Sequence, residues 1–176
     1  AYLFGEPANN NLLLIHGSPG DWSAWENIIA NDSVLQNYFI VAVDRPGYGG
    51  TTVTGQASLA RQAEVISGLI SALHLNNLVI LGHSYGGAVA EQLLVDKPSW
   101  FTLAVFVAPT LSPQHMEPRW YNKVAGITWL QNIIPNDLLT SNVEMVGLPA
   151  SLRLLEPELE GITTPIIYIQ GKEDIL

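Results

Sequence analysis

One serine in this sequence lies where it could act as a nucleophile. Ser84 follows the apolar run 78–81, stands between Gly82 and Gly86, and is followed at once by an apolar stretch of helical period. A serine on so sharp a strand-to-helix turn presents its hydroxyl above the sheet, and side chains in place of the glycines would collide there. A helix beginning at Tyr85 would also direct free backbone N–H groups toward an oxygen bound beside the serine. The pattern therefore predicts an attacking oxygen at Ser84 beside an anion site, to which the N–H of Tyr85 would contribute.

Two further glycine-rich turns each follow an apolar run. Residues 16–20 read H-G-S-P-G, and residues 44–49 read D-R-P-G-Y-G. In an open parallel sheet such turns gather at the carboxyl edge of the strands, where the active sites of this architecture lie. We therefore expect both turns to lie close to Ser84, and we assign the backbone N–H of Ser18 as the second donor to the oxyanion.

The glycines around Ser84 could instead belong to a loop that binds phosphate. The lysine of a P-loop and the G-x-G-x-x-G spacing of a dinucleotide-binding turn are both absent. We therefore disfavour a nucleotide site, although the pentapeptide around Ser84 also occurs in ordinary glycine-rich turns.

The elements that would position these turns alternate along the chain. Short apolar runs bounded by turn residues are separated by stretches of helical period, which is typical of a mostly parallel sheet flanked by helices. One apolar stripe runs through residues 59–73 after a possible N-cap at Ser58, and the helix after Ser84 should end before Pro98. Tyr2 and Phe4 look like the end of a further strand. The strands that we expect span residues 12–15, 39–43, 78–81, 103–108 and 166–170.

Residues 111–161 depart from this alternation. They contain five prolines, stretches of helical period and no apolar run of the kind that forms strands. We interpret them as a helical lid inserted into an α/β core made of residues 1–110 and 162–176. Trp120 and Trp129 in the lid would line a pocket for a hydrophobic group, although aromatic residues at helical spacing are more often part of a core.

The three turns resemble motifs of the α/β-hydrolase superfamily, in particular of its small serine hydrolases. The HGxPG, DxPGxG and GHSxGG motifs of that group correspond to residues 16–20, 44–49 and 82–87. The resemblance implies the α/β-hydrolase fold, here expected to be incomplete at both ends. It also implies that five residues support the site by shaping the backbone, namely His16, Gly17, Gly82, His83 and Gly86.

The resemblance extends to the acid of a catalytic triad but not to its base. Residues 171–174 look like the G-x-x-D segment that carries the acid, which makes Asp174 the candidate and Glu173 its neighbouring competitor. In the superfamily the histidine comes later in the chain, after one more strand. We therefore expect the general base in a segment beyond Leu176. We predict that this chain is a piece of a longer hydrolase, or a truncated gene product, with little or no esterase activity of its own.

The histidines that are present are weak candidates for the base. His16 and His83 belong to the turns themselves, and His74 lies at the end of the expected helix 59–73, where it would cap the helix. His115 lies early in the lid and could contact substrate or act as an improvised base.

The function that the resemblance implies is hydrolysis of a carboxylic ester or related acyl bond through an acyl-enzyme. Serine at position 84 disfavours the aspartate-nucleophile reactions of the superfamily, which include epoxide hydrolysis, whereas carbon–carbon bond hydrolysis and cofactor-free peroxidase activity stay open. The expected partner is a small hydrophobic ester or acyl substrate, and no cofactor and no metal are expected. The alternative is a non-catalytic protein of the same fold that binds a small molecule or a partner.

Composition argues against some other classes of function. With 7 basic and 16 acidic residues the formal charge is −9, so no cluster of Lys and Arg favours a nucleic acid. No apolar run approaches the roughly 20 residues of a membrane-spanning helix. The chain has no cysteine, which suits either redox environment, and the compartment stays open, with the cytoplasm slightly favoured. The sequence does not indicate the oligomeric state.

Overall fold

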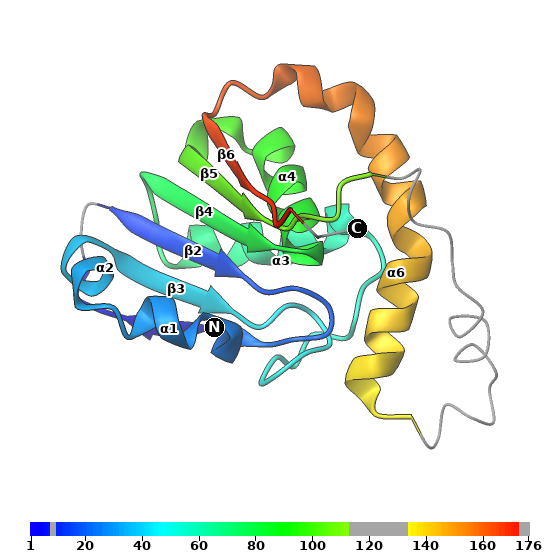
Figure 1. The fold of residues 1–176 in the computed structure, drawn as a ribbon, viewed down its shortest axis with the longest axis horizontal. Coiled ribbons are helices and arrows are strands. Elements are labelled where there is room, and N and C mark those ends of the chain that lie inside the picture. The colour runs from blue at the N-terminus through cyan, green and yellow to red at the C-terminus, as the bar shows by residue number, and fades with distance from the viewer. Residues whose placement is uncertain (8–9, 113–133, 173–176) are drawn as a thin grey trace.

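The computed structural model describes residues 1–7, 10–112 and 134–172. A six-stranded sheet with the strand order β1-β3-β2-β4-β5-β6 runs through the molecule (Figure 1). Within the described ranges only β1 runs antiparallel, against β3, and the other neighbouring pairs are parallel. The predicted fold class, a mostly parallel sheet flanked by helices, is therefore confirmed. The strands are β1 Tyr2–Phe4, β2 Asn11–Ile15, β3 Phe39–Val43, β4 Leu78–His83, β5 Phe101–Val107 and β6 Ile166–Ile169.

Two long helices cover one face of the sheet. They are α3, Leu59–Ala72, and α4, Tyr85–Asp96. The Ser58 hydroxyl accepts a hydrogen bond from the N–H of Arg61, so the expected N-cap is confirmed, and α4 ends before Pro98 as predicted. Alternate residues of the strands point to these helices, and the resulting core continues into a third helix, α6, Asn136–Leu155. The apolar side chains on one face of the strands thus pack against the apolar stripe of α3 and form one layer.

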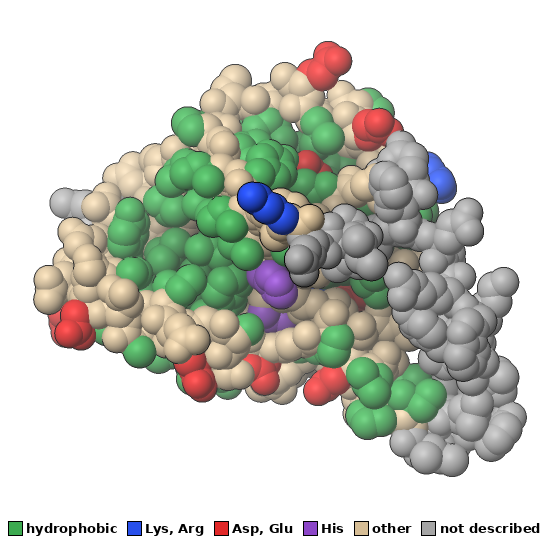
Figure 2. Space-filling view, in the orientation of Figure 1, with side chains coloured by type: hydrophobic (Ala, Val, Ile, Leu, Met, Phe, Trp, Pro, Cys, Tyr) green, Lys and Arg blue, Asp and Glu red, His purple; other side chains and the backbone are tan. Residues whose placement is uncertain are grey.

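The opposite face is covered only in part by shorter elements. These are the 3-10 helix η1 Trp22–Trp25, α1 Glu26–Ile29 and α2 Asp32–Asn37, and their apolar residues pack on β2 and β3. At the far edge of the sheet β6 has no described neighbour beyond it, and Ile167 and Ile169 are 49% and 52% exposed. Figure 2 shows hydrophobic side chains gathered on this face.

One helix stands across the carboxyl ends of the strands. It is α6, Asn136–Leu155, which is followed by the 3-10 helix η4, Glu156–Gly161 (Figure 1). Leu148, Leu152 and Leu155 of α6 are buried in the core formed by the sheet with α3 and α4. Neither residues 111–112 nor residues 134–161 contain a strand. Residues 113–133, with Trp120 and Trp129, lie outside the described residues, so the division into core and lid stays a prediction.

One buried acid should make the stability of this fold depend on pH. Glu91 of α4 is 6% exposed, and burial raises the pKa of its carboxyl from 4.5 to about 7. Because this pKa is higher in the folded than in the unfolded state, stability is lost as pH rises from the unfolded toward the folded pKa.

Glu91→Gln should remove that loss. We expect the free energy of unfolding to increase by about 3 kcal/mol near pH 8 and by less than about 1 kcal/mol near pH 5, as measured by urea denaturation. An equal gain at both pH values would contradict the assignment of the buried charge to Glu91.

Candidate active site

The turn between β4 and α4 holds Ser84 in a strained backbone conformation. Its φ and ψ are 51° and −121°, and it is the N-cap residue of α4 without a capping side-chain hydrogen bond. The N–H of Ser84 donates to Val107 O at 3.0 Å, which ties the turn to the end of β5. Positive φ in a residue other than glycine is costly and is concentrated at functional sites. Ser84 is half-buried, so its hydroxyl is not enclosed beneath the helix.

Glycine is required at two positions of this turn because backbone atoms approach them closely. A Cβ on Gly82 would lie 2.6 Å from Gly86 O, and a Cβ on Gly86 would lie 2.3 Å from Ile15 O. The contact at Gly86 packs the first turn of α4 directly on the end of β2, which brings Ser84 next to the turn that follows β2.

Gly86→Ala should therefore destabilise the protein, whereas the same change on an open helix surface should not. We expect the free energy of unfolding to fall by at least about 2 kcal/mol, because the carbonyl that the new methyl would meet belongs to the backbone. Gly68→Ala in α3 is the control, since a Cβ there meets nothing within 4 Å. It should raise stability by about 0.5–1 kcal/mol. Urea denaturation of both variants checks this, and a harmless Gly86→Ala would contradict the close contact.

The turn after β2 lies against the serine, as expected from the sequence. A Cβ on Gly17 would be 3.2 Å from Ser84 Cβ and 3.0 Å from His83 Nδ1. Among the described residues the N–H groups of Ser18 and Tyr85 have no hydrogen-bond acceptor. For Tyr85 this follows from its place as the first residue of α4. The two predicted oxyanion donors are thus unpaired in the described structure.

His16 is held as a neutral structural residue. Its Nδ1 donates to Gly17 O at 2.7 Å, and its Nε2 accepts from the N–H of Arg45 at 3.0 Å. Burial is the largest cause that lowers the pKa of His16 to about 4, and the nearby Arg45 cation lowers it further. With both ring nitrogens occupied, His16 is unsuited to act as a general base.

The described side-chain partner of the Ser84 hydroxyl is Thr110. A hydrogen bond of 3.2 Å joins Ser84 Oγ to Thr110 Oγ1, and the N–H of Thr110 donates to Ser84 O at 3.2 Å. Thr110 is buried and comes just after β5, at the same carboxyl edge as the other turns. Sequence reasoning missed this residue. The available signal was a hydroxyl side chain directly behind a strand of the parallel sheet.

The structure places two of the remaining candidates for the triad, His83 and His74, and neither forms a hydrogen bond with the Ser84 hydroxyl. His83 is exposed, and its ring stands edge-on to Trp25 with the ring centroids 6.4 Å apart. His74 lies beyond α3 with a φ of 53°. Among the described residues no histidine forms a hydrogen bond with Ser84 Oγ. The candidate acids and the lid histidine lie outside the described residues, namely Glu173, Asp174 and His115.

A buried polar cluster supports the turn after β2 from behind. At its centre Arg45 and Glu144, both fully buried, form an ion pair with Arg45 Nη1 2.5 Å from Glu144 Oε1. Glu144 Oε2 accepts from the Tyr48 hydroxyl at 2.7 Å, and Glu144 Oε1 accepts from Gln62 Nε2 at 2.8 Å. Asp44, the first residue of the second turn, instead binds the N–H groups of Trp22 and Gly50.

Comparison with known proteins gives the family of this chain. The sequence profile described as the alpha/beta hydrolase family matches residues 12–165. The chain belongs to the alpha/beta hydrolase family. The resemblance seen in the three turns is therefore confirmed at the level of the superfamily.

Curated relatives of this alpha/beta hydrolase carry several activities in their names. A dihydrolipoyllysine-residue acetyltransferase component of the acetoin cleaving system from Cupriavidus necator is 32% identical over 99 residues, which is 56% of this chain and 26% of that protein. Epoxide hydrolase 3 from Xenopus tropicalis is 30% identical over 115 residues, 63% of this chain and 31% of the relative. A pimeloyl-(acyl-carrier protein) methyl ester esterase from Pectobacterium carotovorum is 32% identical over 108 residues, which is 60% of this chain and 40% of that protein. This chain therefore spans less than half the length of each of the three.

Solved structures agree with the fold. A structure from work on carboxylesterases of the ammonia-oxidizing thaumarchaeon Nitrososphaera gargenis superposes with a TM-score of 0.75 at 14% identity, covering 97% of this chain and 75% of that one. At this identity the likeness shows the α/β-hydrolase fold alone.

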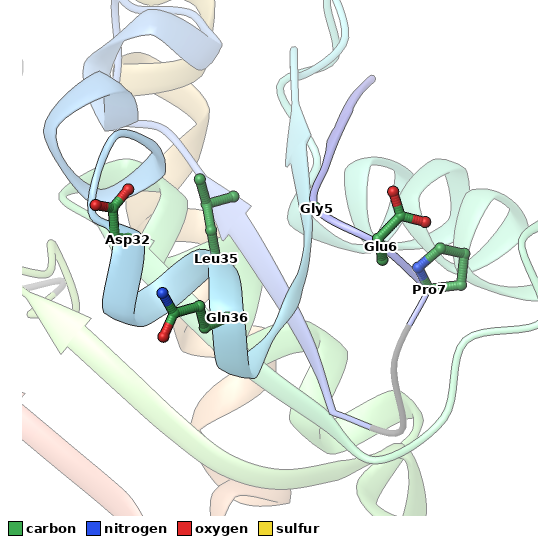
Figure 3. A pocket seen from close by; sticks show the side chains of 6 residues that line it. All are labelled: Gly5, Glu6, Pro7, Asp32, Leu35 and Gln36. Carbon is green, nitrogen blue, oxygen red and sulfur yellow. The ribbon is translucent and has the colours of Figure 1, made fainter.

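A surface pocket of this alpha/beta hydrolase lies away from the serine. Its volume is about 470 Å³, and Figure 3 shows helix α2 on one side and the segment after β1 on the other. Both segments lie at the amino ends of the parallel strands, opposite Ser84. The lining residues are Gly5, Glu6, Pro7, Asp32, Leu35 and Gln36.

Within the described part of the chain no three acidic or histidine side chains are grouped so as to hold a metal ion, and no helix is long and apolar enough to span a bilayer. The chemistry that the described site offers is a half-buried hydroxyl at a helix N-terminus beside two unpaired N–H groups. Such a site can stabilise a negatively charged oxygen bonded to a carbon that the hydroxyl has attacked.

Proposed function

We propose that this alpha/beta hydrolase is a serine hydrolase that cleaves a carboxylic ester or a related acyl bond through an acyl-enzyme. The observation that carries the proposal is the backbone conformation of Ser84. It has a φ of 51° between β4 and α4, and Gly17 of the turn after β2 lies against it. The esterase among the relatives supports an ester substrate.

In this proposal the bond changes follow the usual order of acyl transfer. Ser84 Oγ attacks the carbonyl carbon, and the N–H groups of Ser18 and Tyr85 bind the resulting oxyanion. The tetrahedral intermediate collapses, the alcohol leaves with a proton, and water then releases the acid from Ser84. A histidine oriented by Asp174 would take the serine proton and return it to the leaving group.

Among the described residues nothing supplies that base. His16 is neutral, and both of its ring nitrogens are engaged in hydrogen bonds. The described hydrogen-bond partner of Ser84 Oγ is Thr110 Oγ1. We therefore propose that the 176-residue chain has little or no esterase activity by itself. With the oxyanion donors in place, a base from solution could take the proton of Ser84 Oγ as it attacks the carbonyl carbon, so imidazole should restore part of the rate.

The substrate would enter from the side of α6. We propose that residues 111–161 form a lid over a core of residues 1–110 and 162–176, with Trp120 and Trp129 facing a small hydrophobic acyl or alcohol group. The position of α6 across the carboxyl ends of the strands supports this arrangement (Figure 1).

The test compares Ser84→Ala with the parent chain. With p-nitrophenyl butyrate as substrate and imidazole as the base, Ser84→Ala should lower the protein-dependent rate about 10-fold or more. Ser71→Ala, an exposed serine on α3, should leave it unchanged. A rate that is the same in Ser84→Ala and in the parent would contradict the serine mechanism.

Two other functions are distinguished by the same variant. A non-catalytic binding protein would show no protein-dependent turnover in the parent even with imidazole, and unchanged ligand affinity in Ser84→Ala. The epoxide hydrolase among the relatives raises the second alternative. Serine in place of the aspartate nucleophile that the superfamily uses for epoxides disfavours that reaction, so the chain should not open an epoxide such as styrene oxide.

A further inference from the structure

The carbonyl groups of the turn after β2 are held from behind by one side chain. Arg45 Nε donates to His16 O at 2.9 Å, and Arg45 Nη2 donates to Gly17 O at 2.8 Å. His16 Nδ1 adds a second hydrogen bond to Gly17 O at 2.7 Å. Arg45 is fully buried, and its guanidinium lies over the rings of Tyr48 and Tyr85 at 4.8 and 4.7 Å. The turn is therefore clamped through its carbonyl oxygens.

Clamping a carbonyl fixes the direction of the next N–H. In a trans peptide the N–H points opposite to the C=O of the same unit. Gly17 O points to Arg45, so the N–H of Ser18 points away from Arg45, and it has no acceptor among the described residues. Rotation of this peptide would break two hydrogen bonds to Gly17 O at once. The orientation of the Ser18 N–H is thus set by Arg45 together with His16.

Arg45 is in turn held by a residue that is distant in the sequence. Glu144 of α6 is fully buried and accepts hydrogen bonds from Arg45 Nη1 at 2.5 Å and from Arg45 Nη2 at 3.2 Å. A buried guanidinium without a counter-ion is strongly disfavoured, so Arg45 depends on this carboxylate to stay in place. Ser141 Oγ, one turn earlier in α6, accepts a hydrogen bond from Ser18 Oγ at 3.0 Å. Helix α6 therefore contacts the turn directly through Ser141 and indirectly through Glu144 and Arg45.

We propose that Glu144 is a positioning residue of the oxyanion site, acting through Arg45, so that the Ser18 N–H is aimed correctly only while α6 is docked on the core. The inference rests on the proposed function, because it gives the Ser18 N–H a part in the reaction. It makes α6 a part of the catalytic support in addition to a wall of the substrate site.

The first measurement tests orientation and needs no catalysis. Residual dipolar couplings report the direction of individual N–H bonds in the folded chain. In Glu144→Gln the coupling of Ser18 should change, whereas the couplings of β2 should not. Asp137→Asn, an exposed acid on the same helix, is the matched control and should leave the Ser18 coupling as it is. An unchanged Ser18 coupling in a folded Glu144→Gln would overturn the proposal.

The second measurement separates positioning from a merely structural role. With p-nitrophenyl butyrate and imidazole, Glu144→Gln should lower kcat about 10–100-fold while KM changes less than about 2-fold, since only the oxyanion contact is weakened. A higher KM with unchanged kcat would overturn the proposal. If Glu144→Gln does not fold, Glu144→Asp serves instead. It keeps the negative charge but moves the carboxylate away from Arg45, and it should lower kcat about 10-fold.

Failure of the proposed function would give a result different from failure of the role of Glu144. If Ser84→Ala hydrolyses the ester as fast as the parent, the serine mechanism is wrong. The dipolar coupling of Ser18 in Glu144→Gln would then still decide whether Glu144 sets the direction of this N–H. If the coupling changes but kcat does not, the orienting effect exists but has no part in catalysis, and the proposal is overturned in that respect.

Discussion

Replacing Glu144 with alanine is expected to lower the free energy of unfolding by about 3–5 kcal/mol, because it leaves a buried guanidinium without its counter-ion. Arg45 and Glu144 are both fully buried, and Glu144 also accepts hydrogen bonds from Tyr48 and Gln62. The alanine variant would thus leave three buried donor groups short of an acceptor. Urea denaturation of the folded chain measures the change.

An exposed ion pair in the same protein provides the control. Arg61 and Glu64 of α3 also form an ion pair, but their side chains are 66% and 64% exposed. Solvent screens such a pair, so Glu64→Ala should change the free energy of unfolding by less than about 1 kcal/mol. A loss as small as this in Glu144→Ala would show that the buried cluster does not hold α6 on the core.

The fold was predictable because its signals are local. Each expected strand is an apolar run bounded by turn residues, and each is present, with bounds shifted by at most two residues, as when β4 extends to His83. The two main helices were predictable from a stripe and a cap in α3 and from Pro98 after α4. Tyr2–Phe4 forms a strand, as expected, although its antiparallel pairing with β3 was not predicted.

The placement of the glycine-rich turns was predictable for a related reason. Parallel strands place the turns that follow them on one edge, and a Cβ on Gly17 would indeed lie 3.2 Å from Ser84 Cβ. The roles assigned to the Ser18 and Tyr85 N–H groups and to Asp174 stay predictions.

The support behind the site could not be predicted, because its partners are far apart in the sequence. Arg45 and Glu144 are separated by 99 positions, and Glu144 lies in a segment that was interpreted only as part of a lid. Nothing in the local pattern distinguishes Glu144 from the exposed acids of the same segment. Thr110 was missed for the same reason, since its hydrogen bond to Ser84 depends on the register between β4 and β5.

The second large effect concerns the reactivity of Ser84. An alkyl fluorophosphonate should form a covalent adduct with this residue, in which an Oγ–P bond forms, fluoride leaves and the serine proton passes to a base. The N–H groups of Ser18 and Tyr85, which have no acceptor among the described residues, would stabilise the oxygen on phosphorus as they would an oxyanion. Because no base forms a hydrogen bond with Ser84 Oγ among the described residues, we expect the adduct to form slowly in buffer and faster with imidazole.

Mass spectrometry of the labelled chain, followed by peptide mapping, tests the central claim most directly. We expect one added phosphonyl group, located on Ser84, formed faster with imidazole and absent from Ser84→Ala. A chain that stays unlabelled with imidazole present, or a label that persists in Ser84→Ala, would contradict this claim.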